Sequence, residues 1–112
     1  MNRFPVLVVG DDVATQMAPH ARDWQIGGQW SRLLQVASDN LEDEGVDSAP
    51  VRRLVDVPPV YAIVRDGTWE SRDTMNWPGA EHTGTEVWIA HVGRLMNALD
   101  PDTLLTVVDC HT

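Results

Sequence analysis

The chain of 112 residues contains no lysine and has only one cysteine, one phenylalanine and one tyrosine. Because Cys110 has no second cysteine to pair with, a disulfide within the chain is excluded, and a reducing cytoplasm is the expected compartment. No apolar run approaches the roughly 20 residues that span a membrane. The apolar run at residues 6–9 is also too short for the core of a secretion signal. These absences indicate a cytoplasmic protein without a membrane anchor.

All formal positive charge comes from eight arginines, which stand against 17 acidic residues and leave a net charge of −9. This balance argues against direct nucleic-acid binding, which depends on basic side chains that neutralise phosphates. The acid could serve solubility alone, or it could form a surface that inhibits a host protein by direct contact. Carboxylates gather only between Asp39 and Asp47, whereas a mimic of a phosphate backbone needs a longer stripe. Solubility is therefore the simpler interpretation.

The length fits one domain covering residues 1–112, with a hydrophobic fraction of 43%. A domain of this size buries roughly two-thirds of its unfolded surface, so it needs neither a metal nor a cofactor to fold. The histidines do not have the spacing of a zinc signature. We therefore expect no metal site and no cofactor. The four histidines are His20, His82, His91 and His111.

Local sequence patterns predict mixed secondary structure. Apolar runs rich in β-branched residues indicate strands, and apolar residues at three- and four-residue spacing indicate helices. A stretch with three prolines indicates a long loop. In chain order, the expected elements are strands at residues 4–9 and 24–28, a short helix within 12–21, a helix at 31–44, the loop at 46–59, strands at 60–64 and 68–72, a helix at 85–99 and a strand at 103–110.

These elements mix strands and helices without strict βαβ alternation. They therefore predict an α+β fold: a two-layer sandwich in which a mostly antiparallel sheet of about four strands is covered by two helices. Residues 104–108 are apolar at nearly every position, which is typical of a strand buried on both faces at the centre of a sheet. Asp66-Gly67 between two strands predicts a tight hairpin with positive φ at the turn.

The boundaries of the two main helices are predicted from capping residues. Ser31 is the expected N-cap of the first, and Gly45 ends it. Thr83 and Glu86 have the spacing of a capping box at the start of the second. The apolar faces are expected to consist of Trp30, Leu33, Leu34, Ala37 and Leu41 in the first helix and Trp88, Val92, Leu95, Met96 and Leu99 in the second.

Five tryptophans are unusual in a chain with so few other aromatic residues. Two of them enclose paired glycines in residues 24–30, and a third lies in the Met-Asn-Trp-Pro-Gly segment at 75–79. Glycine and proline oppose regular structure there, and such local costs are typical of functional sites. Indole rings can stack on a nucleobase, and arginine binds phosphate through paired hydrogen bonds. We therefore predict one concave ligand site made by Trp24, Gly27, Gly28, Trp30, Arg65, Arg72, Met75, Trp77, Gly79, Asp109 and His111.

The end of the last predicted strand also permits an enzymatic interpretation. Cys110 and His111 face opposite sides of a regular strand, so they cannot form a nucleophile–base pair. Asp109 and His111 share a face, and a carboxylate there could orient the imidazole for catalysis. The alternative is a solvated strand end without a chemical role. The chain contains no nucleophile elbow, phosphate loop or dinucleotide fingerprint.

The Trp-Gln-Ile-Gly-Gly-Gln-Trp segment at residues 24–30 resembles the Trp-x-x-Gly-Gly-Arg-Trp segment of a family of small phage and prophage proteins, many of them from actinobacteria. Blocks at residues 66–69, 75–79 and 102–111 resemble the same family in the same order. The resemblance covers most of the chain outside residues 31–59. It implies a phage origin and no particular activity.

Three functions are compatible with these observations. The first is a phage-encoded accessory protein that binds a small ligand and sequesters a nucleotide-like signal of host defence. The second is an acidic protein that inhibits a host defence factor by protein–protein contact. The third is a small enzyme that uses Asp109 and His111. The expected partners are a small molecule or a host protein, and a homo-oligomer is also compatible with the sequence.

Overall fold

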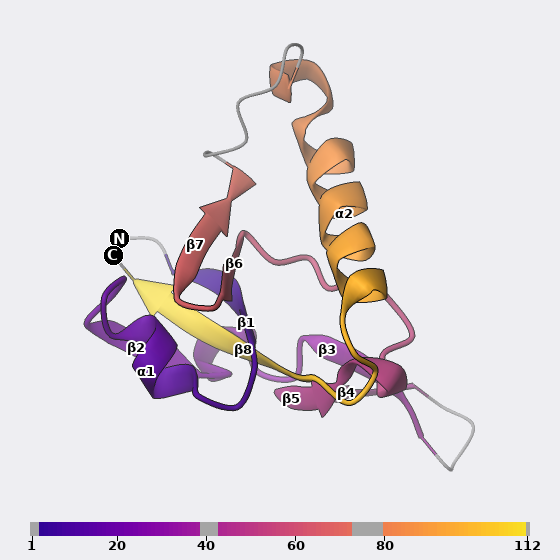
Figure 1. The fold of residues 1–112 in the computed structure, drawn as a ribbon, viewed down its shortest axis with the longest axis horizontal. Coiled ribbons are helices and arrows are strands. Elements are labelled where there is room, and N and C mark those ends of the chain that lie inside the picture. The colour runs from indigo at the N-terminus through magenta and orange to yellow at the C-terminus, as the bar shows by residue number, and fades with distance from the viewer. Residues whose placement is uncertain (1–2, 39–42, 73–79, 112) are drawn as a thin grey trace.

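The computed structural model describes residues 3–38, 43–72 and 80–111, with the side chains of residues 80–84 excepted. Its fold is α+β, as predicted from the sequence (Figure 1). The elements are β1 (Phe4–Val9), α1 (Val13–Met17), β2 (Asp23–Ile26), the 3₁₀ turn η1 (Gly28–Trp30), β3 (Leu34–Ala37), β4 (Asp43–Val46), β5 (Ser48–Pro50), the 3₁₀ turn η2 (Val51–Arg53), β6 (Ala62–Arg65), β7 (Thr68–Ser71), α2 (Ala80–Ala98) and β8 (Leu104–His111).

The main sheet is mostly antiparallel and is built on the pairing of β1 with β8 (Figure 1). Its strand order is β2-β8-β1-β6-β7, and β5 pairs with β8 as a sixth strand. Phe4 lies opposite Cys110 at one end of the central pair, and Val9 lies opposite Leu105 at the other. Only β6 runs parallel to its neighbour β1 within the described sheet. The central position predicted for the last strand is therefore confirmed.

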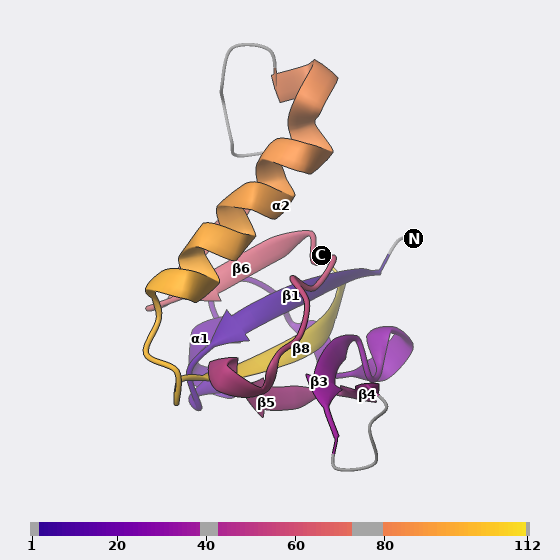
Figure 2. The same ribbon diagram turned by 90° about the vertical axis from the view of Figure 1, so that its right-hand side faces the viewer.

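The two faces of this sheet carry separate apolar cores, because alternate residues of a strand point to opposite sides. Leu7 of β1 packs with Trp88 and Val92 of α2, which covers one face (Figure 2). Val6 packs with Met17 of α1 on the other face. The indole N–H of Trp88 donates a 2.6 Å hydrogen bond to the carbonyl of Val60, so this buried ring leaves no polar group unpaired. The helical face predicted for α2 is thus confirmed.

Two short strands share one edge of β8. The strand β2 pairs with residues 108–111, and β5 pairs with residues 104–106. They meet at Val107, whose carbonyl accepts the N–H of Gly27 and whose N–H donates to the carbonyl of Asp47, both at 2.9 Å. The segments before and after the β3–β4 hairpin are thereby fixed to the same residue.

The helix predicted at residues 31–44 is wrong. The strands β3 and β4 pair there as a separate two-stranded sheet. Leu34 and Val36 are fully buried while Gln35 is exposed, which is the alternation of a strand. The Gln35 carbonyl also accepts the N–H of Val55 at 3.0 Å. Over so short a window the same apolar residues fit both periods, and pairing with other segments decides the outcome.

Three smaller predictions also need correction. The helix α2 begins by Ala80, so Thr83 lies inside it and the capping box with Glu86 is wrong. The loop predicted at residues 46–59 contains β5 and η2, because the edge of β8 offers hydrogen-bond partners to that segment. The described residues form eight strands, more than the four predicted.

The hairpin prediction is confirmed. Asp66 has φ of 53° and Gly67 has φ of 77°, as a two-residue turn between β6 and β7 requires. No helix within the described ranges is long and apolar enough to cross a membrane.

Candidate functional site

The paired glycines form a turn that two carboxylates approach closely. Gly27 and Gly28 have φ of 72° and 51°. A Cβ on Gly27 would lie 2.7 Å from Oδ2 of Asp47, and a Cβ on Gly28 would lie 2.6 Å from Oδ2 of Asp109. In the absence of these atoms, Asp109 accepts the backbone N–H of Gln29 at 2.8 Å. Both glycines are therefore explained by the packing of the turn.

Asp109 is the buried end of a chain of charged groups at the end of β8. Its side chain is 1% exposed, and its Oδ1 lies 3.8 Å from Nη1 of Arg3; neither atom has a hydrogen-bond partner. The other terminal nitrogen of Arg3 donates to Oδ2 of Asp23 at 2.9 Å. The same oxygen of Asp23 lies 3.7 Å from Nδ1 of His111. One guanidinium is thus shared between two carboxylates, of which only Asp23 reaches solvent.

A cavity of about 570 Å³ opens beside these charges. Small-molecule sites in proteins have volumes of about 300–1,000 Å³, so the space is sufficient for a small ligand. The connection between α1 and β2 forms most of its wall, and the end of β8 completes it. The lining residues are Ala18, Pro19, His20, Ala21, Arg22, Asp23 and His111.

The cavity carries less negative charge than this acidic chain does as a whole, because its lining has one arginine and one aspartate. The carboxylate of Asp23 is paired with Arg3, which lies outside the lining. Arg22 is exposed, and the described part of the chain offers its side chain no hydrogen-bond or ion-pair partner. His20 and His111 add two imidazole rings to the lining. An anion in the cavity therefore meets one free cation, Arg22, and two imidazoles.

The position of His20 is fixed by contacts across the α1 face of the sheet. Its Nε2 lies 2.7 Å from the carbonyl oxygen of Gly67 in the β6–β7 turn. Gln16 fixes the same turn by accepting the N–H of Gly67 at 3.2 Å. The ring of His20 also packs on Trp69, with 5.5 Å between the ring centroids. Trp69 in turn makes an edge contact with Phe4. His20, Trp69 and Phe4 therefore form a row of three rings that begins at the cavity wall.

Cys110 lies on the α1 face, fully buried beneath these rings. Burial raises the pKa of its thiol, and the carboxylates of Asp109 and Asp23 raise this pKa further, while Arg3 opposes the shift. The thiol is therefore protonated at neutral pH and is shielded from solvent. The net effect of its surroundings opposes the thiolate form that nucleophilic catalysis needs.

The residues predicted to form one ligand site are distributed over the molecule. Trp24 lies opposite Cys110 and packs on the α1 face, whereas Trp30 packs on the α2 face. The two tryptophans that enclose the glycine turn are therefore separated by the sheet. The segment containing Met75, Trp77 and Gly79 lies outside the described residues.

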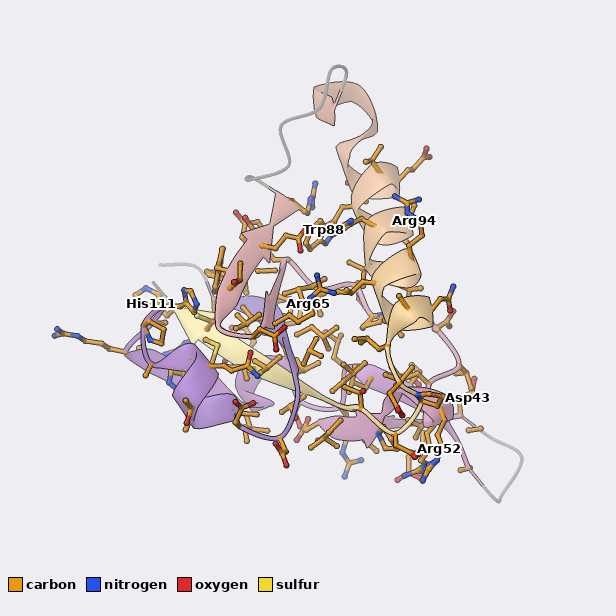
Figure 3. The ribbon with its side chains drawn as sticks, in the orientation of Figure 1. Asp43, Arg52, Arg65, Trp88, Arg94 and His111 are labelled. Carbon is orange, nitrogen blue, oxygen red and sulfur yellow. The ribbon has the colours of Figure 1, made fainter. Side chains whose placement is uncertain are left out.

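The two predicted arginines also lie apart from the end of β8. Arg65 is in register with Val9, which faces Leu105, six residues before His111 and so about 20 Å along the strand (Figure 3). Arg72 follows the edge strand β7 and donates a 3.1 Å hydrogen bond to the hydroxyl of Thr85 in α2.

The catalytic pairing of Asp109 with His111 is not present in this geometry. Both belong to β8, but the Asp109 carboxylate is directed to the N–H of Gln29 and to Arg3. The nearest carboxylate to the imidazole of His111 is that of Asp23 on the neighbouring strand, which the pairing of β2 with β8 places directly opposite.

Sequence reasoning did not assign His20, Arg22 and Asp23, which line the cavity, or Arg3, which pairs with Asp23. The three lining residues precede the segment at residues 24–30 that contains the first two tryptophans. Antiparallel pairing of the strand predicted at residues 24–28 with the last strand would have placed Asp23 beside His111. The contribution of Arg3 had no local signal.

Within the described ranges, no group of three or more His, Cys, Asp or Glu side chains has a geometry that could hold a metal ion. The arrangement is that of an open pocket whose polar lining consists of Arg22, Asp23 and two imidazole rings. Comparison with protein-family models, curated proteins and solved structures finds no match to this chain.

Proposed function

We propose that this protein binds a small phosphate-bearing ligand of the nucleotide type in the cavity lined by residues 18–23 and His111. The observation that carries the proposal is the unpaired guanidinium of Arg22 at a cavity whose one carboxylate, Asp23, is already paired with Arg3. Arginine binds phosphate through paired, charge-assisted hydrogen bonds. A free arginine in a chain of net charge −9 therefore favours an anionic ligand at this point.

The nucleotide class is supported by the rings beside the cavity. His20 lines it and packs on Trp69, which contacts Phe4. Flat rings next to a cation are suited to a base and its phosphate, because any base can stack on an aromatic face. The resemblance to small phage proteins extends the proposal to a phage-encoded accessory protein that sequesters such a ligand from host defence.

Isothermal titration calorimetry with inorganic phosphate, a mononucleotide, a cyclic dinucleotide and ADP-ribose tests the proposal. We expect at least one nucleotide to bind more tightly than phosphate. Arg22→Gln should weaken its binding about tenfold or more, because a hydrogen bond to a charged group contributes about 1.5–3 kcal/mol.

The matched control is Arg53→Gln. Arg53 is also exposed, but it lies in η2 and outside the cavity. If both substitutions change binding equally, the cavity is not the site. Flat titrations across the whole panel at millimolar ligand would refute nucleotide binding.

A further inference from the structure

The outer edge of β2 is an unpaired strand edge. The N–H of Gly27 points toward β8, where it bonds the carbonyl of Val107. In an antiparallel ladder, alternate residues direct their backbone groups to opposite sides, so those of Gln25 also point toward β8 and those of Trp24 and Ile26 point outward. The described turns and loops form no backbone hydrogen bond with either of the outward residues.

This edge also carries exposed apolar surface. Ile26 is 52% exposed, the highest value among the described large hydrophobic residues that are exposed, and Trp24 is half-buried. Trp24 lies opposite Cys110 and Ile26 opposite Val108, so both side chains are on the α1 face. Edge strands of monomeric proteins are usually protected by lysine, proline or a bulge. The strand β2 contains no lysine or proline.

We propose that β2 pairs antiparallel with β2 of a second copy of this chain, around a two-fold axis through Gln25. A two-fold axis perpendicular to the sheet keeps the α1 faces of both copies on the same side, so the paired positions must share a face. With Gln25 on the axis, Trp24 lies opposite the partner's Ile26, and Ile26 lies opposite the partner's Trp24. This register joins the outward backbone groups of both residues in four hydrogen bonds. It also covers each exposed isoleucine with an indole, a favourable cross-strand pair.

The opposite edge of the sheet does not have this self-complementarity. In β7, the position equivalent to Gln25 at the axis is Glu70, which would face the partner's Glu70 with like charge. Its carboxylate lies 2.6 Å from Nε2 of His91. Trp69 is packed against Phe4 and His20 within its own copy. Self-pairing is therefore specific to the β2 edge.

A strand of four residues buries little surface, and interfaces below about 1,200 Å² are typically weak or transient. We therefore expect a dimer that forms at about 100 µM and above. Sedimentation velocity over a concentration series measures this directly. Ile26→Lys should weaken dimerisation about tenfold or more, because a charge replaces a buried side chain in both halves of the contact.

The matched control is Ile89→Lys, which changes an isoleucine of similar exposure, 44%, on α2. It should leave dimerisation unchanged. A protein that stays monomeric at about 1 mM, or an equal effect of both lysine substitutions, overturns the proposal.

A crosslinking test does not depend on the folding of the lysine variant. Residues at the axis form a non-hydrogen-bonded pair with Cα atoms about 4.5 Å apart, within the range that a disulfide spans. Gln25→Cys should therefore give a disulfide-linked dimer under mild oxidation, whereas Gln29→Cys, away from the axis, should not. Equal crosslinking of the two variants also overturns the proposal.

The native Cys110 is fully buried, so the unmodified chain should not crosslink and serves as the negative control. Neither variant alters Arg22, so failure of dimerisation and failure of ligand binding are distinguishable.

Discussion

The two faces of the main sheet are covered by helices of very different length, and this difference determines what each face can do. The α2 face is covered by a helix of 19 residues whose Trp88 and Val92 are buried against Leu7. The α1 face is covered by a helix of five residues, and aromatic side chains that are only partly buried surround its core. A long helix completes a core, whereas a short one leaves rings at the boundary with solvent. The exposed edge residues of β2 belong to this incompletely covered side, and the cavity wall begins at Ala18, directly after the short helix.

The comparison predicts that the α2 face contributes more to stability than the α1 face. Leu7 is fully buried between β8, β6 and α2. Leu7→Ala should lower the free energy of unfolding by about 3–5 kcal/mol, because rigid neighbours cannot fill the cavity that it leaves. Urea unfolding followed by tryptophan fluorescence measures the change. A loss below about 1 kcal/mol would contradict the role assigned to this face.

The matching substitution on the other face is Met17→Ala. Met17 is fully buried too, but its helix has only five residues and can shift toward the sheet. We expect a loss of about 2–3 kcal/mol, at the low end for a buried side chain of this size. A larger loss for Met17→Ala than for Leu7→Ala would reverse the comparison between the two faces.

The turns that contain Gly28 and Gly67 allow a second comparison between two substitutions. Gly28→Ala should destabilise the fold by about 2–4 kcal/mol, because the new Cβ would meet the Asp109 carboxylate at 2.6 Å in addition to the strain of positive φ. Gly67→Ala is the control, since its φ is also positive but nothing lies within 4 Å of the new Cβ. Its cost should be only the backbone strain, about 1–2 kcal/mol. Thermal unfolding of both variants separates the cost of the contact with Asp109 from the cost of backbone strain. Equal losses of stability in the two variants would contradict the packing role given to Asp109.

The smallest expected effect concerns pH. The pKa of Cys110 is raised in the folded protein by burial and by neighbouring carboxylates, so the folded state holds this proton more tightly than the unfolded state does. The unfolded state loses the proton first as the pH rises past the ordinary thiol value of about 8.5. Stability should therefore fall with increasing pH above that value and be fully present below it. Urea midpoints measured at several alkaline pH values should show this slope in the native chain and a shallower one in Cys110→Ala.

Sequence reasoning located the parts of the fold that depend on strong local signals. The apolar run of β1 and the Asp66-Gly67 turn were predicted within a residue or two, and the apolar face of α2 was also correct. The sequence patterns of a two-residue turn with positive φ and of a helix of several turns are compatible with few other structures. The α+β class followed from the mixture of such elements.

The region after the glycine turn was not predictable in the same way. Leu33, Leu34 and Ala37 fit a helical spacing, whereas Leu34 and Val36 fit a strand. Pairing with β4, and with Val55 about 20 residues further along the chain, decides between the two. The cavity was missed for a related reason. Only the sheet brings together Asp23 and His111, which line the cavity, and Arg3, which pairs with Asp23. The tryptophans gave a conspicuous local pattern, yet the sheet separates Trp24 from Trp30.

The position of β8 in the sheet has a consequence for the order in which the chain folds. This strand pairs with β1, β2 and β5, joining Phe4 to Cys110 and Asp23 to His111 across most of the sequence. The β6–β7 hairpin and α2 contain mainly local contacts and can form early, whereas the long-range pairings must close large loops first. We therefore expect slow folding for a chain of this size, on the scale of milliseconds to seconds. Until β8 docks, β1 and β2 expose unpaired apolar edges, and the partly folded chain is then most prone to aggregate.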